Sequence, residues 1–128
     1  MRSCAKEILL AVKMEGGEYE WVQHVPIAIA VGATQAQVDA IADHKLAASC
    51  FSDLERTLLR FTEQVVEKVR ADEPVVREAL GFLSPREIVE LVMTIGFYMT
   101  AARITETTRT DLDPPAGTKV LDQIRRAR

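Results

Sequence analysis

Apolar side chains recur along most of this chain at intervals of three and four residues, the spacing that places them on one face of an α-helix. The first such stretch is Ser3–Met14 and the second runs from Glu18 to Gly32. Pro26 lies inside the second stretch and lacks a backbone N–H, so we expect a kink or a late helix start there. Gly32 suits the position just after the end of that helix.

Three further helix starts carry the capping-box pattern, in which a Ser or Thr is followed three residues later by Glu or Gln. The pairs are Thr34 with Gln37, Ser52 with Glu55, and Ser84 with Glu87. Pro85 follows Ser84 directly, and proline favours the first helical position. These signals predict helices that begin after residues 34, 52 and 84.

The two longest predicted helices differ in how their apolar residues are distributed. The helix after Ser52 carries them on one face, which is typical of a surface helix. Those residues are Leu54, Leu58, Phe61, Val65 and Val69. The helix from Ser84 to about Thr107 is apolar around most of its circumference. That pattern predicts burial, either in the centre of the molecule or in a subunit interface.

The rest of the chain adds short helices and connections but no strand pattern. Residues 74–81 and 120–126 predict short helices, and a Pro- and Gly-containing linker lies between 113 and 117. Alternating apolar and polar residues, the mark of a strand, are not sustained anywhere. We therefore predict an all-α helical bundle of about six helices, formed by a single domain over residues 1–128.

Composition and charge exclude several classes of protein. The net charge is −3 and the only basic cluster is the tail after residue 124, which predicts a solvated helix end and no nucleic-acid partner. The apolar run Val25–Ala33 is too short to span a bilayer, and the first residues do not resemble a signal peptide. The two cysteines, Cys4 and Cys50, form no CxxC pair. We expect a cytoplasmic protein with reduced thiols and no membrane partner.

The strongest candidate for chemistry is the pair Glu20 and His24. They are four residues apart, so in a helix their side chains lie on one face, about 5–6 Å apart at Cβ. A carboxylate beside an imidazole favours the charged imidazolium and orients the ring, which is the minimum equipment for moving a proton. Such pairs are also common on ordinary solvated helices, so the spacing alone leaves a structural role open.

Five segments, in order, resemble the carboxymuconolactone decarboxylase-like family over about residues 6–113. They are K-E-I-L-L-A-V at 6–12, Y-E-W-V-Q-H with P-I-A-I-A-V-G-A-T at 19–34, F-S-D-L-E-R-T-L-L-R-F-T at 51–62, L-S-P-R-E-I-V-E-L-V at 83–92 and I-G-F-Y-M-T-A-A-R at 95–103. The resemblance implies an all-α fold of the alkylhydroperoxidase D type and assembly into homotrimers or homohexamers. It also raises the expectation that the family's N-terminal segment, which precedes the first of these helices, is missing.

The family has two best-known activities. One branch decarboxylates 4-carboxymuconolactone in the breakdown of aromatic compounds. The other, the alkylhydroperoxidase D branch with peroxiredoxin activity, carries the pattern E-x11-C-x2-C-x3-H. Anchored on His24, that pattern places its second cysteine on Glu20 and its first on Gly17. The leading glutamate falls on Ala5, and a connection two residues shorter lets Glu7 take its place. The resemblance thus keeps the proton-transfer residues and loses both redox sulfurs.

We therefore expect a lyase rather than a peroxidase, acting on a small carboxylated ring or lactone without a cofactor or metal. In this hypothesis His24 is the proton donor or electrostatic anchor, Glu20 orients it and Glu7 completes a relay. Tyr98 is a candidate to point its hydroxyl into the site or to be buried elsewhere. Four basic residues are candidates to balance the charge of an anionic substrate: Arg2, Lys6, Arg103 and Arg109.

Two alternatives remain open from sequence. One is a non-catalytic oligomeric protein that binds a small molecule on the same fold. The other is a peroxidase that uses Cys4 or Cys50 in an unusual place, although each is more readily explained as a packed or surface thiol. Glu7, Glu20 and His24 also offer three ligands for a metal, and His44 would join them only if its segment folded back.

Overall fold

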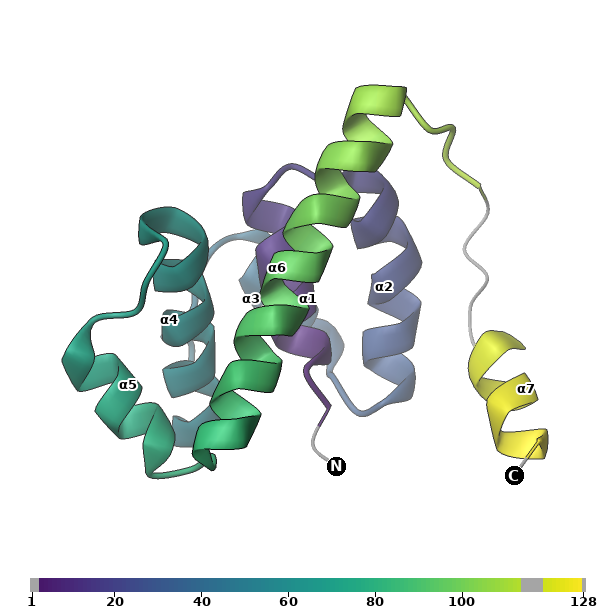
Figure 1. Ribbon diagram of the computed structural model, residues 1–128. Coiled ribbons are helices and arrows are strands. Elements are labelled where there is room, and N and C mark those ends of the chain that lie inside the picture. Colours follow the sequence, from purple (N-terminus) through teal and green to yellow (C-terminus); the bar gives the residue numbers. More distant parts are fainter. Residues whose placement is uncertain (1–2, 114–118, 128) are drawn as a thin grey trace.

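The computed structural model describes residues 3–113 and 119–127, and all regular structure in them is helical. Six helices pack into one body (Figure 1). They are α1 (Ala5–Met14), α2 (Glu18–Ala30), α3 (Gln35–Ala42), α4 (Asp53–Lys68), α5 (Glu73–Leu80) and α6 (Pro85–Thr108). A seventh short helix, α7 (Lys119–Arg126), follows near the C-terminus. The predicted all-α bundle is confirmed.

Helix α1 occupies the centre of the body, where it contacts α2, α3, α4 and α6. Its side chains are shared between two apolar clusters. Leu9 and Leu10 belong to the first cluster, with residues of α2, α3 and the start of α4. Ala11 belongs to the second, with residues of α4, α5 and α6 such as Leu58 and Ile95. The central helix therefore joins the two halves of the core.

The three capping boxes form as predicted, at Thr34, Ser52 and Ser84. The first two are also tied to each other. The side-chain nitrogen of Gln37, Nε2, donates to Oε2 of Glu55 over 3.2 Å and to the carbonyl of Cys50 over 2.9 Å. The starts of α3 and α4 are thus fixed side by side by the same side chains that cap them.

Helix α2 runs through Pro26 without the late start that the sequence suggested. A proline inside a helix removes only one backbone bond, and here packing keeps the helix continuous. The predicted end is confirmed, because Gly32 has a φ of 111° and follows the last turn. The amide of Gly32 donates to Ile29 and that of Ala33 to Ala28, the two bonds of a Schellman motif.

Val69 does not extend the apolar face of α4, as its spacing had predicted. The helix ends at Lys68, and Val69 adopts a left-handed conformation with a φ of 73°. This turn carries the side chain away from the core, so 89% of it is exposed. The spacing of apolar residues identified the buried face of α4 but not the residue at which the helix ends.

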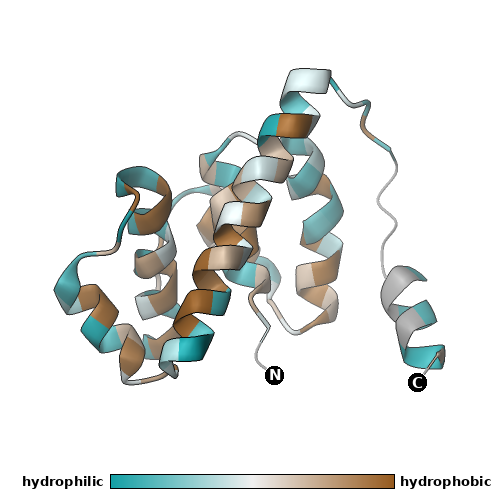
Figure 2. Cartoon of the chain, viewed as in Figure 1, coloured by the Kyte–Doolittle hydropathy of each residue, from teal (hydrophilic) through white to brown (hydrophobic). Residues whose placement is uncertain are grey.

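Helix α6 is not buried in the centre of the bundle. It crosses the front of the other helices (Figure 1), and its fully buried residues are Leu91, Ile95 and Ala102. Apolar residues also occupy its outward side, as the hydropathy colouring shows (Figure 2). By length and composition alone α6 could cross a membrane, a feature that the sequence search for apolar runs missed. The other predicted environment, a subunit interface, remains a prediction.

The C-terminal region contains the predicted last helix, while most of the predicted linker lies outside the described residues. The short last helix is present as α7, and Arg125 and Arg126 are exposed in its last turn, where cations suit the helix dipole. Most of the predicted linker, residues 114–117, lies outside the described residues, as does Arg128.

Candidate functional site

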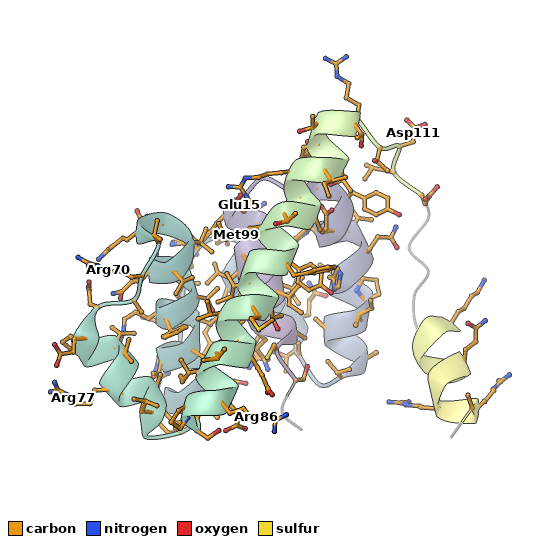
Figure 3. The ribbon with its side chains drawn as sticks, viewed as in Figure 1. Glu15, Arg70, Arg77, Arg86, Met99 and Asp111 are labelled. Carbon is orange, nitrogen blue, oxygen red and sulfur yellow. The ribbon has the colours of Figure 1, made fainter. Side chains whose placement is uncertain are left out.

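The candidate site lies where the first half of α2 faces the second half of α6, and side chains of both helices fill this contact (Figure 3). The hydroxyl of Thr105 donates to Oε1 of Glu20 over 2.7 Å. Glu20 is only 5% exposed. Within the described chain its other oxygen, Oε2, is buried and accepts no hydrogen bond. Glu20 is therefore an interior carboxylate, pinned between the two helices, and not a solvated surface group.

Gly17, just before α2, comes so close to α6 that no side chain fits there. A Cβ at this position would lie 2.8 Å from Cβ of Ala102 and 2.9 Å from Oε2 of Glu20. Both distances are below ordinary van der Waals contact, so a larger residue would have to push the two helices apart. In the peroxidase pattern, this is the position of the first cysteine. The packing of this chain therefore leaves no room for a sulfur at that place.

His24 follows Glu20 by one helical turn and lies against Tyr98 of α6. The two rings meet edge to face, with centroids 4.8 Å apart and planes at 85°. Tyr98 in turn makes a similar contact with Phe97, with centroids 5.2 Å apart. An edge-to-face stack of this kind holds the imidazole in one orientation.

The protonation state of His24 differs from the sequence-based expectation. Burial lowers the pKa of His24 below its usual value, and the charge of Glu20 only partly offsets this effect. The imidazole is therefore neutral near pH 7, whereas the spacing alone had suggested an imidazolium. Burial also raises the pKa of Tyr98, so its phenol keeps its proton at the same pH. Sequence reasoning identified the pair but not the desolvation that decides its charge.

The start of α2 is held by residues from the other end of the chain. Gly17 offers no side-chain cap, and Oε1 of Glu106 accepts from the amide of Glu18 over 3.1 Å instead. The Gln23 amide donates to the Asp113 carbonyl over 3.1 Å, and the Tyr19 hydroxyl donates to the Asp113 carboxylate over 3.3 Å. Sequence reasoning found neither acceptor, because contacts about ninety residues apart leave no local signal.

Glu7 is placed on α1, where it is 1% exposed. Its participation in a relay with Glu20 and His24 stays a prediction. The described residues contain no group of three metal-binding side chains, so Glu7, Glu20 and His24 are not arranged as a metal site. His44 does not fold back towards them, because its Nε2 lies 2.5 Å from Oε1 of Glu63.

The basic residues that were candidates to balance an anionic substrate are largely occupied elsewhere. Lys6 pairs with Glu55 over 2.8 Å, and Arg103 pairs with Glu15, which is labelled with Met99 in Figure 3. Arg109 is exposed at the C-terminal cap of α6, and Arg2 lies outside the described residues. The contact between α2 and α6 thus receives no cation from Lys6 or Arg103.

The two cysteines lie on different parts of the core. Cys4 packs against the second apolar cluster, whereas Cys50 packs against the first, with its sulfur 3.9 Å from the Ala36 carbonyl. A paired-cysteine peroxidase needs an attacking and a resolving thiol in contact. Their separation into two clusters argues against that use.

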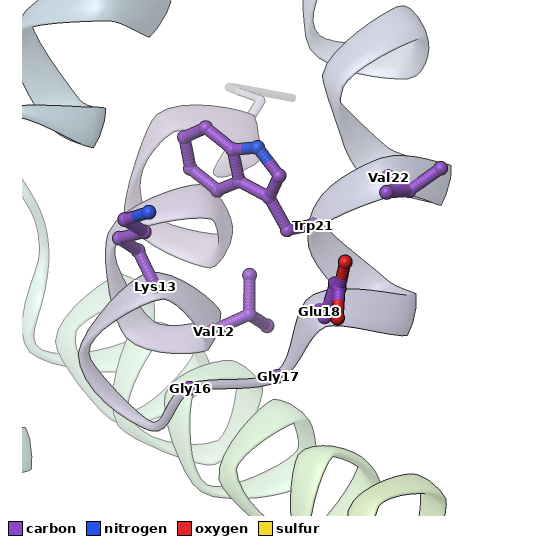
Figure 4. A pocket seen from close by; sticks show the side chains of 7 residues that line it. All are labelled: Val12, Lys13, Gly16, Gly17, Glu18, Trp21 and Val22. Carbon is purple, nitrogen blue, oxygen red and sulfur yellow. The ribbon is translucent and has the colours of Figure 1, made fainter. Parts of the chain in front are cut away.

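Two pockets stand out in the part of the chain that the structure describes, and neither is lined by Glu7, Glu20 or His24. The first, of about 370 Å³, lies at the turn between α1 and α2 (Figure 4). There Nζ of Lys13 lies 5.3 Å from the centre of the Trp21 ring. The second, of about 440 Å³, lies beside the start of α6 and includes Cys4 and two glutamates, Glu87 and Glu90.

Comparison with known proteins identifies the fold. A crystal structure of a protein of unknown function from Agrobacterium tumefaciens, described as a candidate antioxidant defence protein AhpD, is similar with a TM-score of 0.77. The two sequences are 20% identical, and the match covers 85% of this chain and 75% of that chain. The chain has an AhpD-like fold. No family model and no curated protein matches the sequence. An AhpD-like fold by itself leaves the activity open, so the chemistry must be argued from the site.

Proposed function

We propose that this AhpD-like protein performs acid/base chemistry on a small carboxylated ring or lactone, at the contact between α2 and α6. One observation carries the proposal. A half-buried, neutral imidazole, that of His24, lies against the Tyr98 phenol one turn after the buried carboxylate of Glu20. Groups that move protons are therefore gathered where the peroxidase branch would carry its cysteines.

The chemistry assigns different roles to the two rings. When a β,γ-unsaturated lactone acid loses CO₂, the carbon–carbon bond breaks and its electron pair stays on the ring, which must then gain a proton. The sequence assigned this proton to His24, but a neutral imidazole is a poor donor, so Tyr98 takes the role. Burial raises the pKa of its phenol, which therefore holds its proton at neutral pH and, as a weak acid, gives it up only to a strongly basic ring carbanion. His24, being neutral, returns a proton to Tyr98 from water. Glu20 acts on His24 through its charge, which partly offsets the burial that lowers the pKa of the imidazole, while its carboxylate accepts from Thr105. It is too deeply buried to touch a substrate.

The charges around the site favour a substrate with a single carboxylate. Glu20 contributes a buried acidic group, while Lys6 and Arg103 are engaged by Glu55 and Glu15. Bringing a dianion next to an unbalanced carboxylate is strongly unfavourable at low dielectric. We therefore propose a monoanionic ring or lactone. A cytoplasmic location and a role in aromatic catabolism remain part of this hypothesis.

A second candidate function is non-catalytic binding of a small molecule by an oligomer with the same fold. It is favoured by the depth of Glu20 and by the position of the 370 Å³ cavity, which lies at Trp21 and Lys13 and not at His24. In that case Glu20 and Thr105 serve only to join α2 to α6.

The two candidates separate in an assay of lactones that carry one carboxylate, with the dianion 4-carboxymuconolactone for comparison and CO₂ release as the readout. His24→Gln and Tyr98→Phe are expected to lower turnover at least tenfold while thermal stability stays close to that of the wild type. His44→Gln, at the molecule's other histidine, is the matched control. Full turnover in His24→Gln would remove the assignment. Binding without turnover by the wild-type protein would favour the second candidate.

The remaining alternative, thiol-based peroxidase activity, has its own test. Free thiols are counted before and after addition of hydrogen peroxide, and peroxide consumption is compared between the wild type and a Cys4→Ser/Cys50→Ser variant. We expect equal peroxide consumption, because the two thiols lie in different clusters. A loss of consumption in the variant would favour the peroxidase.

A further inference from the structure

Helix α6 presents two opposite stripes of side chains. The inner stripe faces the bundle and comprises Leu91, Ile95, Tyr98, Ala102 and Thr105. We call the opposite set the outer stripe; it comprises Val89, Glu90, Met93, Gly96, Phe97, Thr100, Arg103 and Ile104. All of these residues are exposed in the single chain.

The apolar members of the outer stripe are large and well exposed. Val89 is 58% exposed, Met93 69%, Phe97 66% and Ile104 57%. Contiguous apolar surface of this kind on one helix marks an interaction site more often than a free surface. Nothing in front of α6 covers it within the described chain (Figure 1).

The outer stripe runs along one face of α6 for most of its length. Its members recur every seven residues, as Val89, Gly96 and Arg103 do, with Glu90, Phe97 and Ile104 one position later. Residues seven apart share one face of any helix, so this spacing makes the outer stripe continuous along α6 and long enough for a partner helix to lie along it.

We propose that two copies of this chain pack against each other through the outer stripes of α6, in antiparallel orientation, with the twofold axis between Gly96 and Phe97. The stripe is self-complementary about that point. Phe97 of one copy then faces Gly96 of the other, and Met93 faces Thr100. Towards the ends, the remaining facing pairs are Val89 with Ile104 and Glu90 with Arg103.

The centre of the stripe suits close approach. A Cβ at Gly96 would meet nothing within 4 Å, so the glycine forms an open notch in which an aromatic ring can lie. The neighbouring Thr100 hydroxyl donates to the Gly96 carbonyl over 3.0 Å. Burial of this stretch therefore leaves no hydroxyl donor unpaired, which removes the usual penalty for burying threonine.

Charge selects the antiparallel orientation over the parallel one. Within one copy, Glu90 pairs with Arg86 over 2.8 Å and Arg103 pairs with Glu15. In the antiparallel pair, Glu90 of each copy faces Arg103 of the other, so an attraction is added at both ends while each group keeps its own partner. A parallel pair would place Glu90 against Glu90 and Arg103 against Arg103, and would set Phe97 against Phe97 instead of the notch. Like charges directly opposite each other disfavour that arrangement.

The proposed contact adjoins the candidate site but does not depend on the proposed chemistry. Phe97 stacks on Tyr98, and Tyr98 stacks on His24, so two side chains separate a partner seated on Phe97 from the imidazole. A twofold contact also constrains assembly. It allows a dimer or a hexamer with twofold axes, but not a trimer with a threefold axis alone.

Cross-linking tests the orientation. In a Cys4→Ser/Cys50→Ser background, Met93→Cys and Thr100→Cys variants are prepared separately, mixed, and treated with a short bismaleimide. We expect a covalent dimer from the mixture and little from either variant alone, because positions 93 and 100 face each other only in the antiparallel pair. A dimer of Met93→Cys with itself would overturn the antiparallel arrangement. An absence of cross-linked product, together with a monomeric mass by light scattering, would overturn the proposal entirely.

Substitution tests the surface itself. Phe97→Glu should raise the dissociation constant about thirtyfold in sedimentation analysis, as expected for loss of a central aromatic anchor. Phe82→Glu, an exposed phenylalanine outside the stripe, should leave the constant unchanged. Equal effects of the two variants would contradict the proposal. So would a monomeric wild type that sediments with phosphatidylglycerol vesicles and loses this binding in Phe97→Glu, since α6 would then be covered by lipid.

Discussion

The hydroxyl of Thr105 and the carboxylate of Glu20 form a 2.7 Å hydrogen bond that joins α6 to α2 in the interior of the bundle. Thr105 also lies 3.2 Å from the carbonyls of Ala101 and Ala102, so its hydroxyl is fixed within its own helix as well. The carboxylate whose charge acts on His24 is therefore itself held in place by a side chain 85 residues away.

Replacing Thr105 with Val keeps the shape of the side chain and removes the donor. Because Glu20 is almost fully buried, its carboxylate then loses its donor without gaining water, and we expect a loss of about 1–3 kcal/mol in the free energy of unfolding. Thr94→Val is the control, since the Thr94 hydroxyl lies outside the outer stripe and donates within its own helix, to the Glu90 carbonyl over 2.8 Å. Urea unfolding at a fixed protein concentration measures both. Equal losses in the two variants would mean that the Glu20 contact contributes nothing.

Gly17→Ala tests the close approach of the turn before α2 to α6. The added Cβ would lie 2.8 Å from Cβ of Ala102, so we expect destabilisation of about 1–3 kcal/mol as the helices separate. The helical Gly96 has open space around it, and Gly96→Ala should be neutral or should stabilise the monomer by up to about 1 kcal/mol. Thermal melts of dilute protein compare the two. A neutral Gly17→Ala would show that the contact relaxes freely.

Because of His24, we expect the free energy of unfolding to fall on acidification. Its pKa is lowered by burial in the folded state, so below about pH 6.5 the unfolded chain binds a proton that the folded chain resists. The contribution of His24 is fully present above that pH and is lost as the pH falls through the folded pKa. Unfolding free energies of the wild type and His24→Gln, measured between pH 8 and 5, should therefore converge or cross on the acid side. Imidazole signals in NMR, assigned with His44→Gln, report the pKa directly. A His24 pKa at or above the ordinary value would restore the imidazolium that the sequence suggested.

Because of Glu55, we expect a second loss of folding stability at more acidic pH. Burial alone would raise its pKa, but hydrogen bonds from Lys6 and from the Ser52 backbone outweigh this and lower the pKa. The stability it contributes is therefore present above its usual pKa, about 4.3, and is lost as the pH falls through the lower folded value. Glu55→Gln should be less stable than the wild type at pH 7, and the difference should shrink towards pH 3. Glu67→Gln, at an exposed residue of the same helix, provides the comparison. A difference that did not depend on pH would assign the effect to packing.

The cavity at Trp21 offers a test of the second candidate function. If the protein binds an anionic ring there, Lys13→Met should weaken the binding at least tenfold, because it removes the ammonium that lies over the indole but keeps the length of the side chain. Titration by Trp21 fluorescence measures this, since the chain contains a single tryptophan. His24→Gln, outside the cavity, should leave this binding unchanged. An equal effect of the two variants would place the ligand elsewhere.

Local signals in the sequence determined most of the helices. The three capping boxes depend on residues three apart, so Thr34, Ser52 and Ser84 marked their helix starts without knowledge of the fold. Gly32 marked the end of α2 because a positive φ is easy for glycine alone. The four-residue spacing of Glu20 and His24, likewise, was enough to place both on one side of α2.

Only the tertiary structure decided the burial, the hydrogen-bond partners and the charge of those residues. Burial is set by elements distant in sequence, so the sequence showed neither the Thr105 donor to Glu20 nor the desolvation that keeps His24 neutral. The same holds for α6. Its composition predicted burial on nearly every side, but packing covers only its inner stripe, because one side of α6 faces α1, α2 and α4 and the other faces outward. Periodicity determines which side chains share a face, whereas the arrangement of the other helices decides which face is covered.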